Sequence, residues 1–428
     1  MGGHARAHAA YPRSVAAWPG AVRSYRLYRA ELRHNAVLAN RRNYSLWRVV
    51  RLHAGADLAS GCAACAPYAA AGDASFGAPR KCRPLRMTRK DSSRAIAADL
   101  CRLDVGEVRT GVDLRLYSQW RCGGPADLLV APRNASEVAH LLSYFHERSI
   151  PWAVIGGGSN LFFHDHGVRV PLIHIGRPLG EIRVSGDRDR LHAEAGAWAP
   201  RVALTAMRAG LGGIEHTIGI PGAFGGLVLM NGGSLRQGVG ENVLTVDIVD
   251  ADGQRRHLNR KQCGFAYRRS QLQGRKCVVV GATLQLKPRD PALMRRRMIE
   301  IMASRRKRFP RDMPNCGSVF VSDPALFASF GPPGAVIESC GLKGARVGDA
   351  MVSSRHANFI VNLGAARAED IMALIAHVRE AVAARTGRHM RCEVRFMNCD
   401  GEVREAHEWF APEQAPLPAP ESVETLHG

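Results

Sequence analysis

The chain has 428 residues, of which 46% are hydrophobic, and its formal net charge is +21. This size and composition exclude a wholly disordered protein and suit two or three domains with cores of their own. No run of about 18 uncharged apolar residues is present, and the 11 cysteines follow no disulfide-framework spacing. We therefore expect a cytoplasmic protein with reduced thiols and no membrane association.

Residues 1–105 are rich in Ala, Arg and Gly and lack a sustained helical or strand period. We interpret them as an extension: a disordered arm, an Arg-rich targeting peptide, or residues translated upstream of the true start. Positive charge gathers here and again in 287–311. Nucleic-acid binding, anionic small-molecule binding and codon bias all remain open as explanations. Cys62 and Cys65 offer half a zinc site, but the cysteines after them are single, so we expect no metal.

Regular elements begin after Gly111. The pattern predicts strands at 127–131, 152–155 and 170–175, and a helix at 135–148. The second strand runs into Gly156, Gly157 and Gly158, followed by Ser159 and Asn160. Without Cβ atoms, such glycines let successive N–H groups converge on phosphate oxygens, a geometry that suits the diphosphate of a dinucleotide. An ordinary glycine turn is the alternative reading.

A second unit follows, with a predicted strand at 192–195 and a helix at 200–209. It continues into a glycine-dense loop from Gly219, Ile220, Pro221 and Gly222 to Gly233. Structural turns rarely need so many glycines. Bare backbone of this kind can lie against a flat ring system.

The last unit has a basic helix predicted at 291–308 and a clearer helix at 369–385, with Gly387 at its C-cap. A strand at 392–396 comes next. Its alternation places Cys392, Val394 and Phe396 on one face, and Glu393 with Arg395 on the other. We expect residues after Asp400 to form a loose tail.

The order of these motifs resembles the UDP-N-acetylenolpyruvoylglucosamine reductases of peptidoglycan synthesis, over about Gly111 to Asn398. The matching segments are Cys122-Gly-Gly-Pro-Ala-Asp127, Ile155-Gly-Gly-Gly-Ser-Asn-Leu161, Gly219-Ile-Pro-Gly222 to Met230-Asn-Gly232, Phe265-Ala-Tyr-Arg-Arg-Ser270, Pro314-Asn-Cys-Gly-Ser-Val-Phe320, Gly341-Leu-Lys-Gly344, His356-Ala-Asn-Phe359 and Cys392-Glu-Val-Arg395. No long insertion carries the tyrosine that clamps substrate in one subgroup, so the chain resembles the shorter, second subgroup.

The resemblance implies an α+β fold: a two-subdomain FAD-binding module of the vanillyl-alcohol-oxidase-like (PCMH) type and a C-terminal α+β substrate domain. The expected boundaries are 106–178 and 179–288 for the two FAD-binding subdomains, 289–400 for the substrate domain, and 401–428 for the tail.

The resemblance also implies an activity that couples cell-wall synthesis to cell shape and division. NADPH reduces FAD, and hydride then passes to UDP-N-acetylglucosamine enolpyruvate to form UDP-N-acetylmuramate, with a small molecule as the only expected partner and a monomer as the expected state. The implied catalytic arginine is Arg268, the proton donor Ser318 and the carboxylate Glu393. FAD contacts are implied for Gly156, Gly157, Gly158, Ser159 and Asn160 at the diphosphate, and for Gly219, Ile220, Pro221 and Gly222 near the ring.

These roles agree with the chemistry of the residues. Hydride addition places charge on the substrate carboxylate, which a planar cation such as Arg268 binds more strongly in the transition state. Each residue also has an ordinary reading: a surface arginine, a turn-capping serine, an exposed strand carboxylate. Arg269 is the nearest rival to Arg268. Val321 and the 322–332 loop depart from the family pattern and raise the question of how the UDP end is held.

Two other functions stay open. A different flavin oxidoreductase of the same fold, such as a 2-hydroxy-acid dehydrogenase, shares the glycine motifs but does not need Arg268, Ser318 and Glu393 together. A basic nucleic-acid-binding protein rests on net charge alone and lacks an aromatic-basic face.

Overall fold

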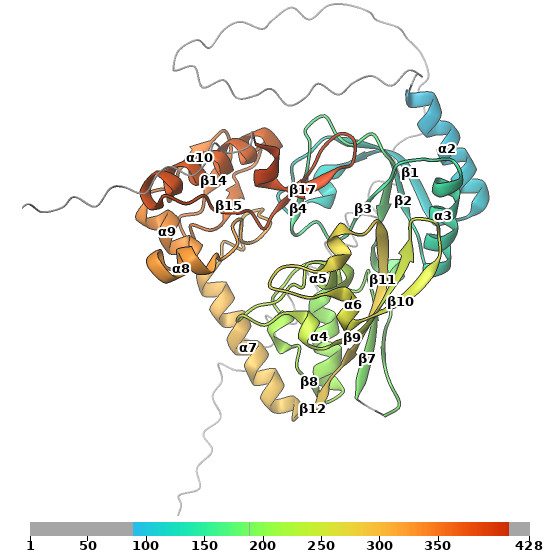
Figure 1. Cartoon of the computed structure of the whole chain (residues 1–428), viewed down its shortest axis with the longest axis horizontal. Coiled ribbons are helices and arrows are strands. Elements are labelled where there is room, and N and C mark those ends of the chain that lie inside the picture. The colour runs from blue at the N-terminus through green and yellow to red at the C-terminus, as the bar shows by residue number, and fades with distance from the viewer. Residues whose placement is uncertain (1–88, 188, 411–428) are drawn as a thin grey trace, which may run out of the picture. The chain divides into compact units, whose positions relative to one another are not determined.

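The computed structural model describes residues 89–187 and 189–410 (Figure 1). The pair Cys62 and Cys65 and the final residues of the predicted tail lie outside these ranges. Within the described ranges, no helix is both long enough and apolar enough to cross a membrane.

The first subdomain is built on a four-stranded sheet in the order β1-β2-β5-β3, in which β1 is antiparallel and the other pairs are parallel. Its strands are β1 (Glu107–Asp113), β2 (Pro125–Ala131), β3 (Ala153–Ile155) and β5 (Leu172–His174). Helix α3 (Ala135–Glu147) begins at Asn134, whose side chain accepts a hydrogen bond from the Glu137 N–H. The helix buries Leu141, Leu142 and Phe145 in the core.

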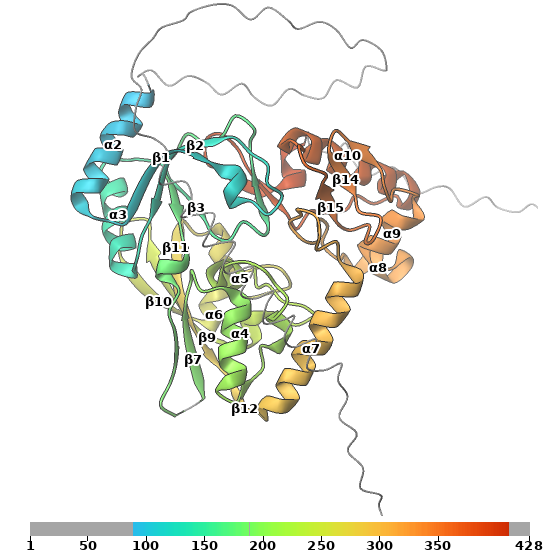
Figure 2. The ribbon, with the colours of Figure 1, turned by 180° about the vertical axis from the view of Figure 1, so that it is seen from behind.

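Helix α2 (Arg89–Leu103) differs from the prediction that residues 1–105 are an extension. Leu100 is fully buried in the same core cluster as Leu141, and the Tyr144 hydroxyl donates to Asp99 at 2.8 Å. Figures 1 and 2 show α2 and α3 beside each other near β1 and β2. Sequence periodicity missed this helix because most of its residues are polar or alanine, which leaves only a weak apolar stripe.

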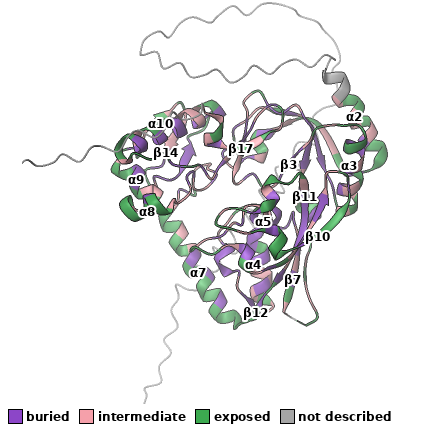
Figure 3. Cartoon of the chain, in the orientation of Figure 1, coloured by how far each residue is buried: buried purple, intermediate pink, exposed green. Residues whose placement is uncertain are grey.

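The second subdomain is a five-stranded antiparallel sheet in the order β10-β9-β11-β7-β6. Its strands are β6 (Ile182–Val184), β7 (Arg190–Glu194), β9 (Val243–Asp250), β10 (Arg255–Asn259) and β11 (Cys277–Gln285). The helices between them are α4 (Ala199–Arg208), α5 (Phe224–Leu229) and α6 (Arg260–Cys263). Their apolar side chains join those of the first subdomain in one core cluster, and buried residues follow β11 and α4 in Figure 3.

A long helix, α7 (Pro291–Arg308), leads to the C-terminal domain. It begins where predicted, because Asp290 caps it and Pro291 occupies its first turn. The strand just before it, β12 (Lys287–Pro288), pairs with β8 (Leu211–Gly212). Most of α7 is exposed, and its buried residues are Met294, Met298 and Ile301.

The C-terminal domain has its own core cluster around helix α10 (Ala368–Thr386). The predicted stripe Ile371, Leu374, Ile375, Val378 and Val382 is buried, and Gly387 ends the helix at φ +68°. The remaining elements are α8 (Pro324–Phe330), α9 (Pro333–Ser339) and the antiparallel strands β13 (Arg346–Val347), β14 (Ala350–Val352) and β15 (Ile360–Asn362). Helix α8 stands where the sequence predicted a loop at 322–332.

A three-stranded sheet joins the first subdomain to the C-terminal domain. In it β4 (Leu161–Phe163) is parallel to β16 (Arg395–Met397), which is antiparallel to β17 (Val403–Glu405). Strand β17 lies in the segment predicted as a loose tail, so that prediction is wrong up to Phe410. Pairing to β16 and the full burial of Ala406 hold this part of the chain. Strand β4 starts directly after the glycine loop, and β16 starts two residues after Glu393, so the pairing of these strands brings the loop close to Glu393.

Candidate active site

The two glycine loops predicted from the sequence lie against each other. A Cβ on Gly157 would be 2.7 Å from the Gly222 Cα, and a Cβ on Gly222 would be 2.6 Å from the Ser159 Oγ. Gly222 also has φ +125°, a backbone conformation that L-residues rarely adopt. Glycine is therefore required on both sides of this contact, because a side chain would force the loops apart.

The first loop also presents backbone donors. Within the described part of the chain, the N–H groups from Gly156 to Asn160 donate no hydrogen bond to protein. A Cβ on Gly158 would be 1.8 Å from the Tyr117 carbonyl oxygen, so the loop packs tightly against the backbone at Tyr117. Successive unpaired N–H groups on bare backbone form an anion-binding concavity. The loop therefore fits the diphosphate of FAD.

The side chain of Asn160 has a different contact from the predicted one. Its Nδ2 donates to the Glu393 backbone carbonyl oxygen at 2.9 Å, and the backbone carbonyl of Asn160 accepts from the Arg395 N–H at 3.0 Å. Asn160 thus ties the glycine loop to Glu393 and to the start of β16, which is shorter than the strand predicted at 392–396 because it begins only at Arg395. The backbone N–H of Asn160 donates no hydrogen bond to the described residues and remains available to a ligand.

Arg268 occupies a strained turn. Ala266 and Arg269 exchange backbone hydrogen bonds of 2.9 and 3.0 Å, and Arg268 between them has φ +56°. A positive φ at this turn position normally selects glycine. Strained non-glycine residues of this kind cluster at functional sites.

The Arg268 side chain points at Glu393. Its Nε lies 2.9 Å from Glu393 Oε1, an ion pair in which the N–H direction falls outside hydrogen-bond geometry. Its Nη2 donates to the Gly233 carbonyl oxygen at 2.9 Å. The guanidinium thus touches both the Glu393 carboxylate and the second glycine-rich loop. The neighbouring Arg269 is exposed.

Glu393 is largely buried, and burial raises the pKa of its carboxyl group. The Arg268 charge opposes this shift in pKa but does not reverse it. The expected alternation is observed, since Cys392, Val394 and Phe396 are buried in the core while Glu393 and Arg395 lie on the more open face. Glu393 is thus a carboxyl group that can retain a proton at a higher pH than usual.

Ser318 lies on the chain segment paired with Glu393. Its neighbour Val319 accepts a hydrogen bond from the Glu393 N–H at 2.7 Å, and Phe320 forms an antiparallel bridge with Cys392. The preceding Gly317 has φ +81° and turns the chain into this pairing. The Ser318 side chain is half-buried and makes no hydrogen bond to the described residues, so its hydroxyl is available to a ligand.

Other residues of this region were not predicted as site residues. Asn231, with φ +43°, donates to the Ala266 carbonyl and accepts from Gly240, which fixes the turn of Arg268. The Gln273 amide donates to the Arg268 carbonyl and accepts from Arg395. Asn231 had two signals in the sequence: the length of the glycine-rich segment around it and its place in the matching Met230-Asn-Gly232 segment. Gln273 had none.

Arg305 was read only as part of a basic helix. Its side chain packs on the ring loop, since a Cβ on Gly219 would be 2.4 Å from the Arg305 Cδ. Burial, together with the charges of neighbouring arginines that include Arg268, lowers the pKa of Arg305 to about 10. Its guanidinium also lies 4.7 Å from the centre of the Phe309 ring. The site therefore carries more positive charge than its carboxylates neutralise.

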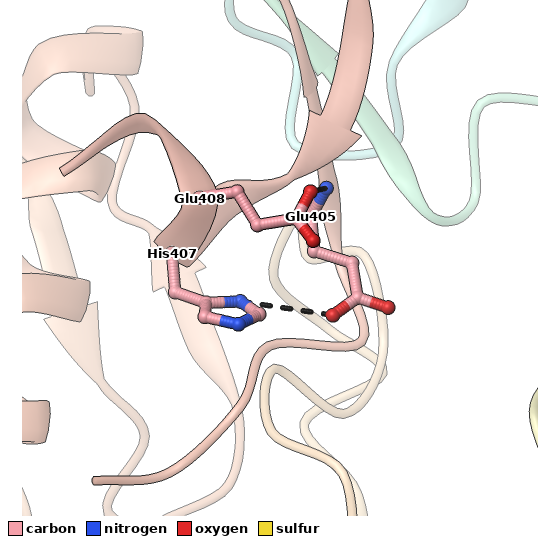
Figure 4. Close-up of side chains that lie close together, drawn as sticks. All are labelled: Glu405, His407 and Glu408. Atoms are coloured by element: carbon pink, nitrogen blue, oxygen red, sulfur yellow. Dashed lines mark hydrogen bonds and ion pairs between the residues drawn. The ribbon is translucent and has the colours of Figure 1, made fainter. Parts of the chain in front are cut away.

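Glu405, His407 and Glu408 form a separate cluster of potential metal ligands, with atoms within 4.8 Å of one another (Figure 4). Their polar atoms serve the protein instead. His407 Nδ1 accepts from the Cys392 N–H at 3.1 Å, and Glu408 accepts from the Glu405 N–H at 3.2 Å. Arg391 lies 3.3 Å from Glu405. We therefore assign no metal to this cluster.

Comparisons with known proteins agree with this site. The family model described as "UDP-N-acetylenolpyruvoylglucosamine reductase, C-terminal domain" matches residues 309–397, and an FAD-binding domain model matches residues 126–259. The predicted architecture, an FAD-binding module followed by an α+β substrate domain, is thus confirmed.

Individual relatives point to the same family. UDP-N-acetylenolpyruvoylglucosamine reductase 1 of Corynebacterium glutamicum is 43% identical over 307 residues, which cover 72% of this chain and 91% of the relative. The reductase of Heliobacterium modesticaldum is 42% identical over 286 residues, 67% of this chain and 89% of the relative. The crystal structure of the Thermus caldophilus reductase superposes with a TM-score of 0.57 at 32% identity, covering 68% of this chain and 98% of that one. The chain therefore belongs to the UDP-N-acetylenolpyruvoylglucosamine reductase family.

Proposed function

We propose that this chain uses FAD and NADPH to reduce UDP-N-acetylglucosamine enolpyruvate to UDP-N-acetylmuramate, with Arg268, Ser318 and Glu393 as its catalytic residues. The observation that carries the proposal is the Arg268–Glu393 ion pair of 2.9 Å. The Glu393 backbone is hydrogen-bonded to Asn160 of the first glycine loop and to Val319, the neighbour of Ser318. A 2-hydroxy-acid dehydrogenase on the same fold has no need of this trio.

The glycine loops hold the cofactor in this account. The N–H groups from Gly156 to Asn160 would bind the diphosphate, with the Ser159 hydroxyl as a further donor, and Gly219, Ile220, Pro221 and Gly222 would hold the flavin end. When bound, FAD would supply the hydride transfer from NADPH to the terminal carbon of the enolpyruvyl group.

Arg268 stabilises the charge that then develops. Hydride addition turns the substrate carboxylate into an enediolate, and a guanidinium already fixed by Gly233 and Glu393 meets that charge without reorganisation. The strained turn holds the guanidinium in place.

Ser318 supplies the proton to the adjacent carbon. A half-buried hydroxyl without a hydrogen bond to the described residues suits this role, because position governs a proton transfer from a serine more than its ordinary pKa does. The neighbouring Val319 is hydrogen-bonded to the Glu393 backbone. Glu393, with its raised pKa, donates a hydrogen bond to the enediolate when protonated and would repel it when ionised.

The remaining positive charge suits the anionic nucleotide. Arg305 stands at the ring loop without a carboxylate partner among the described residues. Lys343, in contrast, pairs with Glu338, so we assign it no contact with a substrate phosphate. NADPH and a nucleotide sugar are cytoplasmic metabolites, so we place the enzyme in the cytoplasm. We propose separately that it acts as a monomer.

The test is a product assay. The purified chain should be yellow, and under anaerobic conditions it should oxidise more than one equivalent of NADPH per flavin only when UDP-N-acetylglucosamine enolpyruvate is present. Mass spectrometry should find a product heavier by two hydrogens. Oxidation of a 2-hydroxy acid with no reaction of the enolpyruvyl nucleotide would favour the other oxidoreductase. A colourless protein that binds DNA would favour the nucleic-acid reading.

A further inference from the structure

The segment next to the Arg268 contact contains a turn with unusual residues. Gln237 donates to the Ser234 carbonyl at 3.0 Å, and the two residues between them, Leu235 and Arg236, have φ +56° and +63°. Consecutive positive φ values define a turn that strongly prefers Asn-Gly or Gly-Gly. Leucine and arginine in these positions cost about 1 kcal/mol or more each. Leu235 is also 51% exposed, so burial of its side chain does not explain the choice.

Surrounding contacts hold this turn in place. The Ser234 hydroxyl donates to the His216 carbonyl at 2.6 Å, and Gly233 accepts from Arg268. A Cβ on Gly233 would lie 1.8 Å from the Gln237 carbonyl oxygen, so the segment closes tightly on itself. The turn is therefore a fixed feature on the same short segment that contacts the catalytic arginine.

Helix α8 of the C-terminal domain meets this turn. Asp323 caps the helix, Pro324 starts it, and Leu326 anchors it in the core. Phe327 and Phe330 remain 40% and 43% exposed. The Arg236 guanidinium lies 5.1 Å from the centre of the Phe327 ring, so the second FAD-binding subdomain touches the C-terminal domain here.

The contact between Arg236 and Phe327 leaves both side chains able to bind a ligand. Arg236 is exposed and, among the described residues, has no carboxylate partner. Its guanidinium can therefore pair with a phosphate while it stays on the aromatic ring. An exposed phenylalanine ring beside it offers a flat apolar surface of the kind on which nucleobases stack.

We infer that Arg236 and Phe327 form a clamp for the nucleotide end of the substrate, with Arg236 on the diphosphate and Phe327 against the uracil ring. The inference rests on the proposed function. It explains why a strained turn is kept, since the positive φ values direct Arg236 toward α8. It also gives a role to helix α8, which lies in the 322–332 segment that departs from the family pattern.

The experiment is a calorimetric titration of the oxidised FAD enzyme with UDP, which measures the affinity for UDP. Arg236→Ala and Phe327→Ala should each weaken UDP binding about ten- to a hundred-fold, and should raise the KM for the enolpyruvyl nucleotide by a similar factor. Phe330→Ala is the matched control. It removes an equally exposed ring from the same helix that Arg236 does not contact, and it should bind UDP as the wild type does. FAD content and melting temperature establish that each variant is folded.

Two results would overturn the clamp: wild-type UDP affinity in both Arg236→Ala and Phe327→Ala, or an equal loss in Phe330→Ala. Failure of the proposed function would look different, because the wild-type enzyme itself would then not reduce the enolpyruvyl nucleotide.

Discussion

At the scale of single residues, the site depends on groups held in unfavourable states. Arg268 has a backbone conformation that favours glycine, and Glu393 is a buried carboxyl group with a raised pKa. The sequence motifs pointed to both residues, but neither the strain nor the ion pair between them could be predicted. They come from turns and strand pairings far apart in the chain.

The raised pKa of Glu393 leads to a pH prediction. The protonated form persists to higher pH than for an ordinary glutamate, and in the proposed mechanism only that form would donate a hydrogen bond to the enediolate. The rate of substrate reduction should therefore fall as pH rises through this raised pKa. Glu393→Gln keeps the donor at every pH, so its rate profile should lack this fall. An unchanged alkaline limb in Glu393→Gln would assign the titration to another group.

At the scale of elements, the packing of the two glycine loops decides whether the cofactor binds. Gly157→Ala would bring a Cβ within 2.7 Å of the Gly222 Cα, so we expect the purified variant to lose most of its FAD. The ratio of flavin to protein absorbance measures this. Gly226→Ala is the control, because a Cβ there meets nothing within 4 Å. It lies in helix α5, where alanine should add about 0.5–1 kcal/mol of stability. Full FAD occupancy in Gly157→Ala would show that the loops adjust.

The outer face of the second sheet carries a separate pH-dependent element. The Asp247 carboxylate contacts His192 at 3.0 Å and His257 at 2.6 Å, and the hydrogen bond from His192 is the main cause of its lowered pKa. His192 reaches across strand β11 at Gly281, which has no side chain to block it.

Asp247→Asn should therefore lower the free energy of unfolding at pH 7 by about 1 kcal/mol. The ionised carboxylate stabilises the fold above its unfolded pKa of about 4. That stabilisation is lost as pH falls through the lowered folded pKa, so the difference between variant and wild type should shrink in acid. Urea titrations across pH measure it, with the exposed Asp400→Asn as control. A difference independent of pH would contradict the assignment.

The sequence predicted long elements better than short ones. Helix α7 matched at both ends because Asp290 and Pro291 mark its start, and α10 matched within a residue at each end because of its apolar stripe and C-cap glycine. Helix α8 was missed because its 7 residues are too few to show a helical period in the sequence. Pairings such as β4 with β16 depend on tertiary packing, which one sequence does not reveal.

At the scale of the whole molecule, helix α2 is part of the folded body. Leu100 is fully buried against the first sheet, whereas the sequence placed it in an extension. A chain that starts at residue 104 should lose at least about 2 kcal/mol of stability relative to one that starts at residue 89, because Leu100 and its neighbours no longer cover the core. Equal urea midpoints for the two chains would show that α2 contributes nothing. FAD content of the longer chain should match that of the full chain.

At the scale of the whole molecule, the FAD-binding module and the substrate domain meet at the Arg268–Glu393 ion pair. We propose that the residues around this pair act in the second half of the reaction, the reduction of the substrate by the flavin. The most direct measurement is anaerobic stopped-flow absorbance of the flavin in the wild type and in Ser318→Ala. NADPH should bleach both at the same rate. UDP-N-acetylglucosamine enolpyruvate should then reoxidise the wild type rapidly and Ser318→Ala about 10²–10⁴ times more slowly. A wild type that is bleached but not reoxidised by this nucleotide, or a Ser318→Ala variant that is reoxidised at the wild-type rate, would contradict the account.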